Sequence, residues 1–386
     1  MKVLCIGVSS YELTFPADEF PKENSRYSVA EKVDGSAGMA ATVSYLLATW
    51  GIETYVSSIV GSDDYGSRIR KELESVGVKT EYLDTSFDKP TSMRVSIVNK
   101  STGGKILYDT SEGTARIRKE EWALSPDIVV ASSKEYHAAM TAFNRFGDKI
   151  TVLVADEYTA ETADLCKYAK YVIASKEVAE KISGKPVNLQ SPTTLAGIFN
   201  ILVEKYYKTN FIITLAEGGA LFASDGQIRV TTGINAKAID TTSAKDIFAG
   251  AFVYSLAVNY DIPKCIQVAN IAGGLSTEKI GSHAAIPPLN SVMTALTQKL
   301  GGSVAVSNDK PQQPQAAPAP AATAAPAAQQ PAAAQPATPA PAATPAPATP
   351  ASAPATPAAP TASTNPPPVT AVQGNQPTIN NTTPQQ

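Results

Sequence analysis

The sequence predicts an α/β protein with a mostly parallel, doubly wound sheet that is flanked by helices. Three observations support this prediction. Short apolar runs rich in β-branched residues recur through the first 300 positions, stretches with helical spacing of apolar residues separate them, and glycines follow several of these stretches. Strands that are apolar throughout and alternate with helices are typical of a parallel sheet that is covered on both faces.

The expected strands and helices follow one another along the chain. The strands are Val3–Val8, Thr54–Val60, Asp127–Ala131, Ile150–Ala155, Tyr171–Ala174 and Phe211–Leu215. The first two expected helices have apolar faces that end before Gly51 and Gly77, which are suitable C-terminal caps. The last three are Ser243–Val258, Lys264–Lys279 and Ser291–Leu300. These three helices are expected to close the domain.

Two segments lack a crossover helix between their strands. Residues 11–33 and about 90–110 carry short alternating patterns, and the second resembles a hairpin of Ser92–Asn99 and Lys105–Tyr108 around a glycine-containing turn. Together they are expected to form a small antiparallel sheet over one edge of the main sheet. A lid over a functional site and an exposed hairpin without a function are both compatible with this pattern.

The C-terminal part of the chain has a different composition. From position 311 to 386 there is no charged and no aromatic residue, and 45 of the 76 positions are alanine or proline. Such a segment cannot build a packed core. We therefore expect a domain over residues 1–300, with lid inserts at about 11–33 and 90–110, a linker over 301–310, and a disordered Ala/Pro-rich tail over 311–386.

Charge and cysteine content restrict the class of protein. The formal net charge is −3 and no basic stripe is present, which argues against binding to nucleic acid or to an anionic membrane. The N-terminus resembles a buried strand rather than a signal peptide. Cys5, Cys166 and Cys265 are few, widely spaced and set among apolar residues, as reduced core thiols are. A cytoplasmic location is expected.

Two familiar phosphate-binding patterns are absent. The segment from Gly61 to Gly66 has the glycine spacing of a phosphate loop, but it continues with Ser67 and Arg68 instead of Lys-Ser and carries two aspartates. The first strand leads into a turn without the glycines of a dinucleotide fold. His137 and His283 have no cysteine or carboxylate cluster at metal-ligand spacing.

The most informative segment is Asp240–Phe252, in which a polar turn of small residues precedes an apolar helix. The free N–H groups of the first helical turn and the positive end of the helix dipole favour an anion at that place. Asp246 lies in this first turn. Its carboxylate is either a structural cap of the helix or a group that acts on a bound ligand.

This segment resembles the second signature of the ribokinase-type (PfkB) sugar and nucleoside kinases. The first signature is visible from Ala37 to Ser44, and shorter family motifs follow in order at Gly61–Gly66, Ile213–Gly219 and Ala269–Ala272. The resemblance extends over about residues 2–297 and leaves out the tail. It implies a ribokinase-like fold with a small β lid.

By this resemblance the protein is an ATP-dependent kinase of a small sugar or related alcohol that uses Mg²⁺ and, as many relatives do, a monovalent cation such as K⁺. The resemblance implies Asp246 as general base and Ser243, Ala244 and Lys245 as the anion hole. It implies Glu12, Gly38 and Thr42 for the acceptor, Thr214, Ala216, Gly219 and Asn270 for the nucleotide, and Asp240 and Thr242 for the monovalent cation. A homodimer formed through the lid is also implied.

Several departures from the family pattern fall on these positions. Lys245 replaces a glycine of the anion hole, so that its amine either adds a positive charge to the phosphates or pairs with Asp246 and disables the base. Thr42 replaces an asparagine, Glu12 an aspartate and Ala216 a glycine, while Ser175 and Val178 stand where the family has the Asn and Glu linked to magnesium, with Glu177 one position away.

Two other functions therefore remain open beside the kinase. One is a catalytically impaired pseudokinase that acts as a ligand-binding or scaffold protein. The other is a scaffold in which the tail binds a protein partner.

Overall fold

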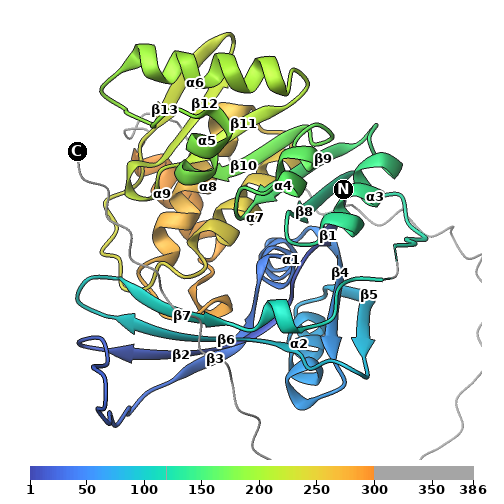
Figure 1. The fold of residues 1–386 in the computed structure, drawn as a ribbon, viewed down its shortest axis with the longest axis vertical. Coiled ribbons are helices and arrows are strands. Elements are labelled where there is room, and N and C mark those ends of the chain that lie inside the picture. The colour runs from blue at the N-terminus through green and yellow to red at the C-terminus, as the bar shows by residue number, and fades with distance from the viewer. Residues whose placement is uncertain (119, 300–386) are drawn as a thin grey trace, which may run out of the picture. The chain divides into compact units, whose positions relative to one another are not determined.

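A computed structural model of the chain describes residues 1–118 and 120–299, which form thirteen strands and nine α-helices within one compact unit (Figure 1). Nine strands build the main sheet in the order β13-β12-β11-β10-β9-β8-β1-β4-β5. In that order they are β13 (Gln227–Thr231), β12 (Ala220–Ser224), β11 (Asn210–Thr214), β10 (Tyr171–Ser175), β9 (Ile150–Ala155), β8 (Ile128–Ser132), β1 (Lys2–Ile6), β4 (Glu53–Gly61) and β5 (Lys79–Ser86).

The main sheet is parallel from β11 to β5, and β12 and β13 add an antiparallel edge. Strand β1 is paired with β4 on one side and β8 on the other. The chain therefore builds outward from β1 in one direction and then returns to build in the other. In open α/β sheets, ligands bind outside the carboxyl ends of the strands at such a reversal.

Helices cover both faces of the main sheet. One face packs against α1 (Met39–Thr49), α7 (Ala244–Ala257), α8 (Ile262–Ser276) and α9 (Leu289–Lys299). The other packs against α3 (Tyr136–Arg145), α4 (Ala160–Leu165), α5 (Lys176–Ser183) and α6 (Pro192–Lys205). In β1, Val3 and Cys5 join the first core and Leu4 and Ile6 the second, because successive side chains of a strand point to opposite faces.

The second sheet has four strands in the order β3-β2-β6-β7, and we call it the small sheet. Its strands are β2 (Ser10–Ala17), β3 (Val33–Ala37), β6 (Ser92–Asn99) and β7 (Lys105–Asp109). It crosses one end of the main body in Figure 1, next to α2 (Asp64–Ser75). A methyl group added to Gly103, in the turn between β6 and β7, would lie 3.0 Å from the carbonyl oxygen of Ala238, so this turn contacts the loop that precedes α7.

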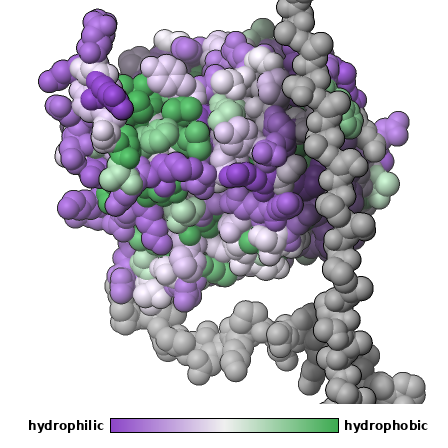
Figure 2. Space-filling view, turned by 90° about the horizontal axis from the view of Figure 1, so that it is seen from below, coloured by the Kyte–Doolittle hydropathy of each residue, from purple (hydrophilic) through white to green (hydrophobic). Residues whose placement is uncertain are grey.

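The outer face of the small sheet is partly apolar. Leu13, Val95 and Ile97 are half-buried, and Tyr108 is 63% exposed. Figure 2, which looks at the molecule from the side of the small sheet, shows apolar side chains gathered in one area of this face. The opposite face of the same sheet carries charged side chains toward the main body.

The structure confirms the predicted α/β architecture and its mostly parallel main sheet. The small sheet was expected to be antiparallel, which is wrong where the two inserts meet, because β2 and β6 run parallel. The antiparallel pair β12–β13 was not predicted, because only β12 has the apolar character of a buried strand, whereas β13 is largely exposed. The expected helix at 264–279 begins earlier, at Ile262, because Asp261 caps it through the N–H of Lys264, and it ends at Ser276. The end of the expected domain at residue 300, the linker at 301–310 and the tail at 311–386 lie outside the described residues. Within them, no helix has both the length and the apolar character needed to span a membrane.

Candidate active site

The candidate site lies where the carboxyl ends of β8 and β9, the N-terminus of α7 and the inner face of the small sheet meet. Polar residues follow the apolar strands at this edge: Ser132 ends β8, and Asp156 directly follows β9. Across the cleft, Glu12 of β2 and Arg94 of β6 are paired in register and therefore share one face of the small sheet. The parallel sheet thus supplies one wall of the site and the small sheet the other.

Asp246 lies in the first turn of α7 and is 6% exposed. Burial raises the pKa of its carboxyl group above the ordinary range, although the positive charges of Lys245, Arg94 and Lys105 act against this shift. A buried carboxylate with a raised pKa is a stronger base than an exposed one. Asp246 does not cap α7: the N-cap is Ser243, whose side chain bonds elsewhere, so the structural alternative for Asp246 gains no support.

Lys245 makes a contact that the sequence did not predict. Its Nζ donates a hydrogen bond to Asp156 and forms an ion pair with it. Burial alone would lower the pKa of Lys245, but the negative charges of Asp156 and Asp246 raise it, so the amine stays charged. Asp156 is also held by the hydroxyl of Ser132 at 2.7 Å. The carboxylate that holds the lysine is therefore Asp156, and not Asp246 as one of the two alternatives had it.

A chain of hydroxyl groups connects the anion hole with the acceptor side. The Ser243 hydroxyl donates to that of Ser282 at 2.7 Å, and the Ser282 hydroxyl donates to Glu12 at 2.8 Å. Thr14 donates to the other oxygen of Glu12 at 3.1 Å. Burial raises the pKa of Glu12, and these hydrogen bonds reduce the effect. A cavity of about 240 Å³ borders Glu12, Thr14 and Ser282.

Gly38 is the N-cap of α1, and Thr42 lies in its first turn. Gly38 has φ of +87°, and a Cβ atom there would be 2.5 Å from the carbonyl oxygen of Val8, so only glycine fits between α1 and the loop after β1. The hydroxyl of Thr42 is buried, and within residues 1–118 and 120–299 it has no hydrogen-bond partner. A buried hydroxyl without a hydrogen-bond partner destabilises the folded protein unless a bound ligand supplies that partner.

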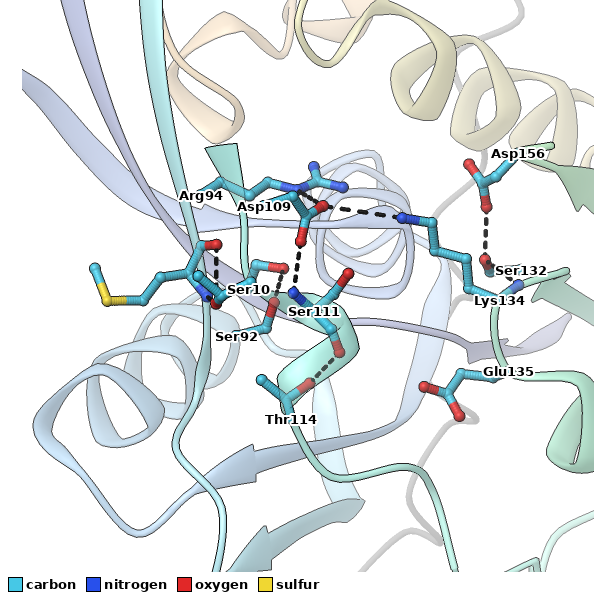
Figure 3. Close-up of polar contacts among 12 residues, drawn as sticks. Ser10, Ser92, Arg94, Asp109, Ser111, Thr114, Ser132, Lys134, Glu135 and Asp156 are labelled. Carbon is cyan, nitrogen blue, oxygen red and sulfur yellow. Dashed lines mark hydrogen bonds and ion pairs between the residues drawn. The ribbon is translucent and has the colours of Figure 1, made fainter. Parts of the chain in front are cut away.

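The inner face of the small sheet adds a charged group that the sequence analysis missed (Figure 3). The Nε atom of Arg94 donates to Asp109 of β7 at 3.2 Å, and Asp109 is fixed by the N–H of Ser111 at 2.8 Å. The Nζ atom of Lys134 is 3.9 Å from the same oxygen of Asp109. Figure 3 shows Arg94 and Lys134 approaching Asp109 from different elements, with Asp156 and Ser132 on the far side of Lys134.

The expected nucleotide residues lie at the other end of the cleft, around β11, β12 and α8. Gly219 has φ of +89°, and a Cβ atom there would lie 1.9 Å from the carbonyl oxygen of Thr231. Asn270 donates to that same carbonyl at 3.0 Å. Thr214 donates to Ala174 at 3.3 Å, and Ala216 has φ of +51°, which is unusual for a residue with a side chain. These residues shape the backbone there without a charged side chain among them.

The expected monovalent-cation residues are bonded to each other and to the loop after α8. Asp240 accepts from the N–H and the hydroxyl of Thr242 at 2.8 and 2.5 Å, and from the N–H of Gly281 at 3.0 Å. The part of the chain that the structure describes has no group of three or more His, Cys, Asp or Glu side chains arranged for a metal ion. Mg²⁺ in other proteins is commonly held by the phosphates of a ligand and by water, with few protein ligands.

The segment from 175 to 178 cannot supply the carboxylate that the family has there. Ser175 caps α5 by accepting from the N–H of Val178 at 3.3 Å. The Val178 side chain is buried in the core under α5. Glu177 is exposed, and its own backbone N–H and the hydroxyl of Ser175 hold the pKa of its carboxyl group below the ordinary range. The departure seen in the sequence is therefore also a departure in structure.

Asp156, Arg94, Asp109, Lys134 and Ser282 are functional candidates that sequence reasoning missed. Asp156 could have been found, because a polar residue directly after a buried parallel strand lies at the ligand-binding edge of the sheet. Arg94 alternates with apolar residues in the hairpin, but nothing in the pattern shows which phase faces inward. No sequence motif or periodic pattern marks Ser282 as a site residue.

The arrangement suits a ligand with several negative charges. The free N–H groups at the start of α7 and the cations Lys245, Arg94 and Lys105 surround Asp246, and Lys134 acts on the neighbouring Asp156. A polyphosphate group beside a buried carboxylate is what transfer of a phosphoryl group to a hydroxyl requires. The residues present thus fit a nucleoside triphosphate at this place.

Comparisons with known proteins agree with this geometry. Residues 1–288 match the family described as pfkB family carbohydrate kinase. The chain is similar to a ribokinase of Staphylococcus aureus, with 26% identity over 75% of this chain and 98% of the relative. It shares its fold with a putative ribokinase from Agrobacterium tumefaciens, with a TM-score of 0.69 and 20% identity over 78% of this chain and 98% of that one. It also shares its fold with the Arabidopsis thaliana ribokinase complexed with ribose and ATP, with a TM-score of 0.64 and 18% identity over 76% and 98% of the two chains.

Proposed function

Because the chain belongs to the pfkB family of carbohydrate kinases, we propose that it transfers the γ-phosphoryl group of ATP to a hydroxyl of a small sugar or related alcohol. The observation that carries the proposal is the buried carboxylate of Asp246, which lies in the first turn of α7 amid cationic side chains. The geometry supports transfer better than binding alone. The negative charge of Asp246 repels a bound phosphate, so this carboxylate is useful at an anion site only if it accepts a proton during the reaction.

Each part of the site has a role in this reaction. Asp246 takes the proton of the acceptor hydroxyl as its oxygen bonds to the γ-phosphorus, and the bond from that phosphorus to the bridging oxygen breaks and releases ADP. The backbone N–H groups of Ser243, Ala244 and Lys245 face the charge that builds up on the transferring group. The amine of Lys245 adds a positive charge there when it leaves Asp156 for the phosphates.

Acceptor and nucleotide are held at opposite ends of the cleft. Glu12 and the Thr42 hydroxyl bind acceptor hydroxyls, and Gly38 lets the start of α1 lie close to the loop after β1, on the acceptor side. The nucleotide lies along Thr214, Ala216, Gly219 and Asn270. Mg²⁺ enters with the phosphates of ATP, and a monovalent cation such as K⁺ binds beside Asp240 and Thr242.

A homodimer is the proposed assembly, with the small sheets facing each other. Its support is the apolar outer face around Val95, Ile97 and Tyr108, which a second copy would cover. The size of the full chain in light scattering tests it: a dimer that Tyr108→Asp converts to a monomer is expected, and a monomeric full chain at micromolar concentration contradicts it. A cytoplasmic location and a protein partner of the tail remain proposals.

The activity is tested by ADP release from the full chain with ATP, Mg²⁺ and a panel of pentoses, hexoses and nucleosides. We expect release that depends on an acceptor and that is lost in Asp246→Asn. Mass spectrometry of the product identifies the phosphorylated hydroxyl. Binding of ATP without turnover on any acceptor would instead support the pseudokinase, and recovery of turnover in Lys245→Gly would then locate the impairment at the anion hole.

A further inference from the structure

Arg94 is placed where an acceptor would bind, in the wall of the site that faces Asp246. It lies on β6 in register with Glu12 of β2 on one side and Asp109 of β7 on the other. Its side chain is 14% exposed. A long cationic side chain that is this far buried needs partners for its charge and for its five N–H groups.

The hydrogen bond of Arg94 to Asp109 uses Nε, and it leaves the two terminal nitrogens of the guanidinium group for another partner. Asp109 binds Nε at 3.2 Å and is itself fixed by Ser111, so it sets the direction of the arginine side chain. For the two terminal nitrogens, no hydrogen-bond acceptor is found within residues 1–118 and 120–299. Figure 3 shows this end of Arg94 pointing away from Asp109 with no dashed contact. An oriented arginine with both terminal nitrogens free matches the two oxygens of a carboxylate or phosphate.

The carboxylates near Arg94 act on its charge, Asp246 most strongly, but within the described residues none of them accepts a hydrogen bond from its terminal nitrogens. Asp156 is bound by Lys245 and Ser132, and Asp109 is shared between Arg94 and Lys134. Asp246 must stay free to accept a proton. Glu12 is bound by two hydroxyl groups, and burial raises the pKa of its carboxyl group, which weakens its negative charge. A neutral sugar would leave the open edge of Arg94 facing hydroxyl groups only.

We propose that the acceptor carries an anionic group, a carboxylate or a phosphate, which the terminal nitrogens of Arg94 bind while Lys134 and Lys105 add to the positive field. The hydroxyl that is phosphorylated lies toward Asp246, and the anionic group lies toward β6. Asp109 is a positioning residue that holds Arg94 through Nε. This inference rests on the proposed kinase function and narrows its substrate class to sugar acids and sugar phosphates.

The test compares matched acceptors in the full chain with Mg-ATP: pentoses and hexoses, their aldonates and their monophosphates. We expect kcat/KM for an anionic acceptor to exceed that of its neutral parent by about 100-fold, as two charge-assisted hydrogen bonds of about 1.5 kcal/mol each imply. The two anionic arms separate carboxylate from phosphate. A neutral sugar preferred over both of its anionic forms overturns the proposal.

Variants assign the preference to Arg94. Arg94→Met is expected to raise KM for the anionic acceptor about 100-fold and to change KM for ATP less than two-fold, with Arg94→Lys in between. Asp109→Asn is expected to raise the same KM by a smaller factor at nearly unchanged kcat. Arg145→Met, an exposed arginine on α3, serves as the matched control and should change neither constant. A rise in KM for ATP instead would place Arg94 at the nucleotide phosphates and overturn the proposal.

Calorimetry without ATP separates this inference from the kinase function. If no acceptor turns over but an aldonate or a sugar phosphate binds and Arg94→Met abolishes the binding, the inference holds and the proposed transfer fails. If neutral sugars turn over and no anionic sugar binds or reacts, the transfer holds and the inference fails. Should Arg94→Met not fold, Arg94→Lys and Lys134→Met give the same comparison.

Discussion

The two ends of the cleft are built by different means. At the nucleotide end, around β11, β12 and α8, the expected site residues are Thr214, Ala216, Gly219 and Asn270, and backbone geometry determines their arrangement. At the acceptor end, four cations and four carboxylates from β2, β6, β7, α7 and the loops after β8 and β9 act on one another electrostatically: Arg94, Lys105, Lys134 and Lys245, with Glu12, Asp109, Asp156 and Asp246.

This difference explains where the chain keeps the family pattern and where it departs from it. A backbone crossing tolerates almost no change of side chain, so the nucleotide end keeps its glycine at 219, and its departure at Ala216 adds only a methyl group. A cluster of charges can be rebuilt by exchanging residues as long as the charges remain compensated. Lys245 is the example, since its charge is matched by Asp156.

The largest expected effect comes from removing the charge of Asp246. Asp246→Asn should lower kcat by about 10²–10⁴-fold, which is the usual contribution of a general base. The variant should also unfold at a higher temperature at pH 7. Burial raises the folded-state pKa of Asp246, so folding favours its neutral form, and the stability that it lends at low pH is lost as pH rises from about 4 through the raised pKa.

Thermal unfolding of both proteins from pH 4 to pH 8 checks this sign. The gain from Asp246→Asn should be absent at the acid end and grow with pH. A variant that is less stable than the native protein at pH 7 would mean that the surrounding cations have a larger effect than burial on the pKa of Asp246. The charges at the acceptor end would then stabilise the fold, which contradicts the contrast between the two ends of the cleft.

At the nucleotide end the largest effect is expected from Gly219→Ala. The new Cβ atom must move away from the carbonyl oxygen of Thr231, 1.9 Å distant, and the residue keeps a positive φ. We expect a loss of about 3 kcal/mol in the free energy of unfolding, together with weaker ATP binding. Urea denaturation and calorimetric titration with ATP provide the two measurements.

Gly77→Ala is the control for that variant. Gly77 has φ of +90°, close to that of Gly219, but a Cβ atom there would meet nothing within 4 Å. The free energy of unfolding should fall by only about 1 kcal/mol, which is the cost of a positive φ for alanine. ATP binding should be unchanged. Equal losses in the two variants would show that the contact with Thr231 contributes nothing to the nucleotide end.

The ion pair between Lys245 and Asp156 allows a double-mutant cycle. Lys245→Met and Asp156→Asn should each cost about 1–3 kcal/mol, because each leaves a partly buried charge without its partner. The double variant should cost clearly less than both losses added together. The exposed pair Arg229–Asp225 is the control, and its removal should cost less than about 0.5 kcal/mol. Additive losses at Lys245 and Asp156 would show that the two charges are compensated elsewhere.

The smallest effect is expected from Ala216→Gly. Ala216 has φ of +51°, a region that costs a residue with a Cβ atom about 1 kcal/mol and costs glycine little. The variant should be more stable by somewhat less than that amount, since glycine also gains freedom in the unfolded chain. A lower unfolding temperature would indicate that the Ala216 side chain makes packing contacts that outweigh its backbone strain.

Much of the fold followed from the sequence because apolar runs and helical faces repeat with clear periods. Of the two edge strands that were missed, β13 is exposed and carries no such period, whereas β12 is buried but spans only Ala220–Ser224. The roles proposed for Asp246 and Gly219 rest on a resemblance and on their place at a helix start and a tight crossing, and they stay predictions. The partners of Lys245 and Arg94 did not follow, because their contacts join residues 89 and 15 positions apart, and the choice between partners is made only by packing.

The hydroxyl chain from Ser243 through Ser282 to Glu12 also joins two parts of the molecule that are far apart in the sequence. Glu12 belongs to β2 of the small sheet, whereas Ser243 and Ser282 belong to the main body. Any displacement of β2 from the main body would have to break the hydrogen bond from Ser282 to Glu12. The small sheet and the start of α7 are thus coupled through two hydroxyl groups, and the position of one bears on the hydrogen bonding of the other.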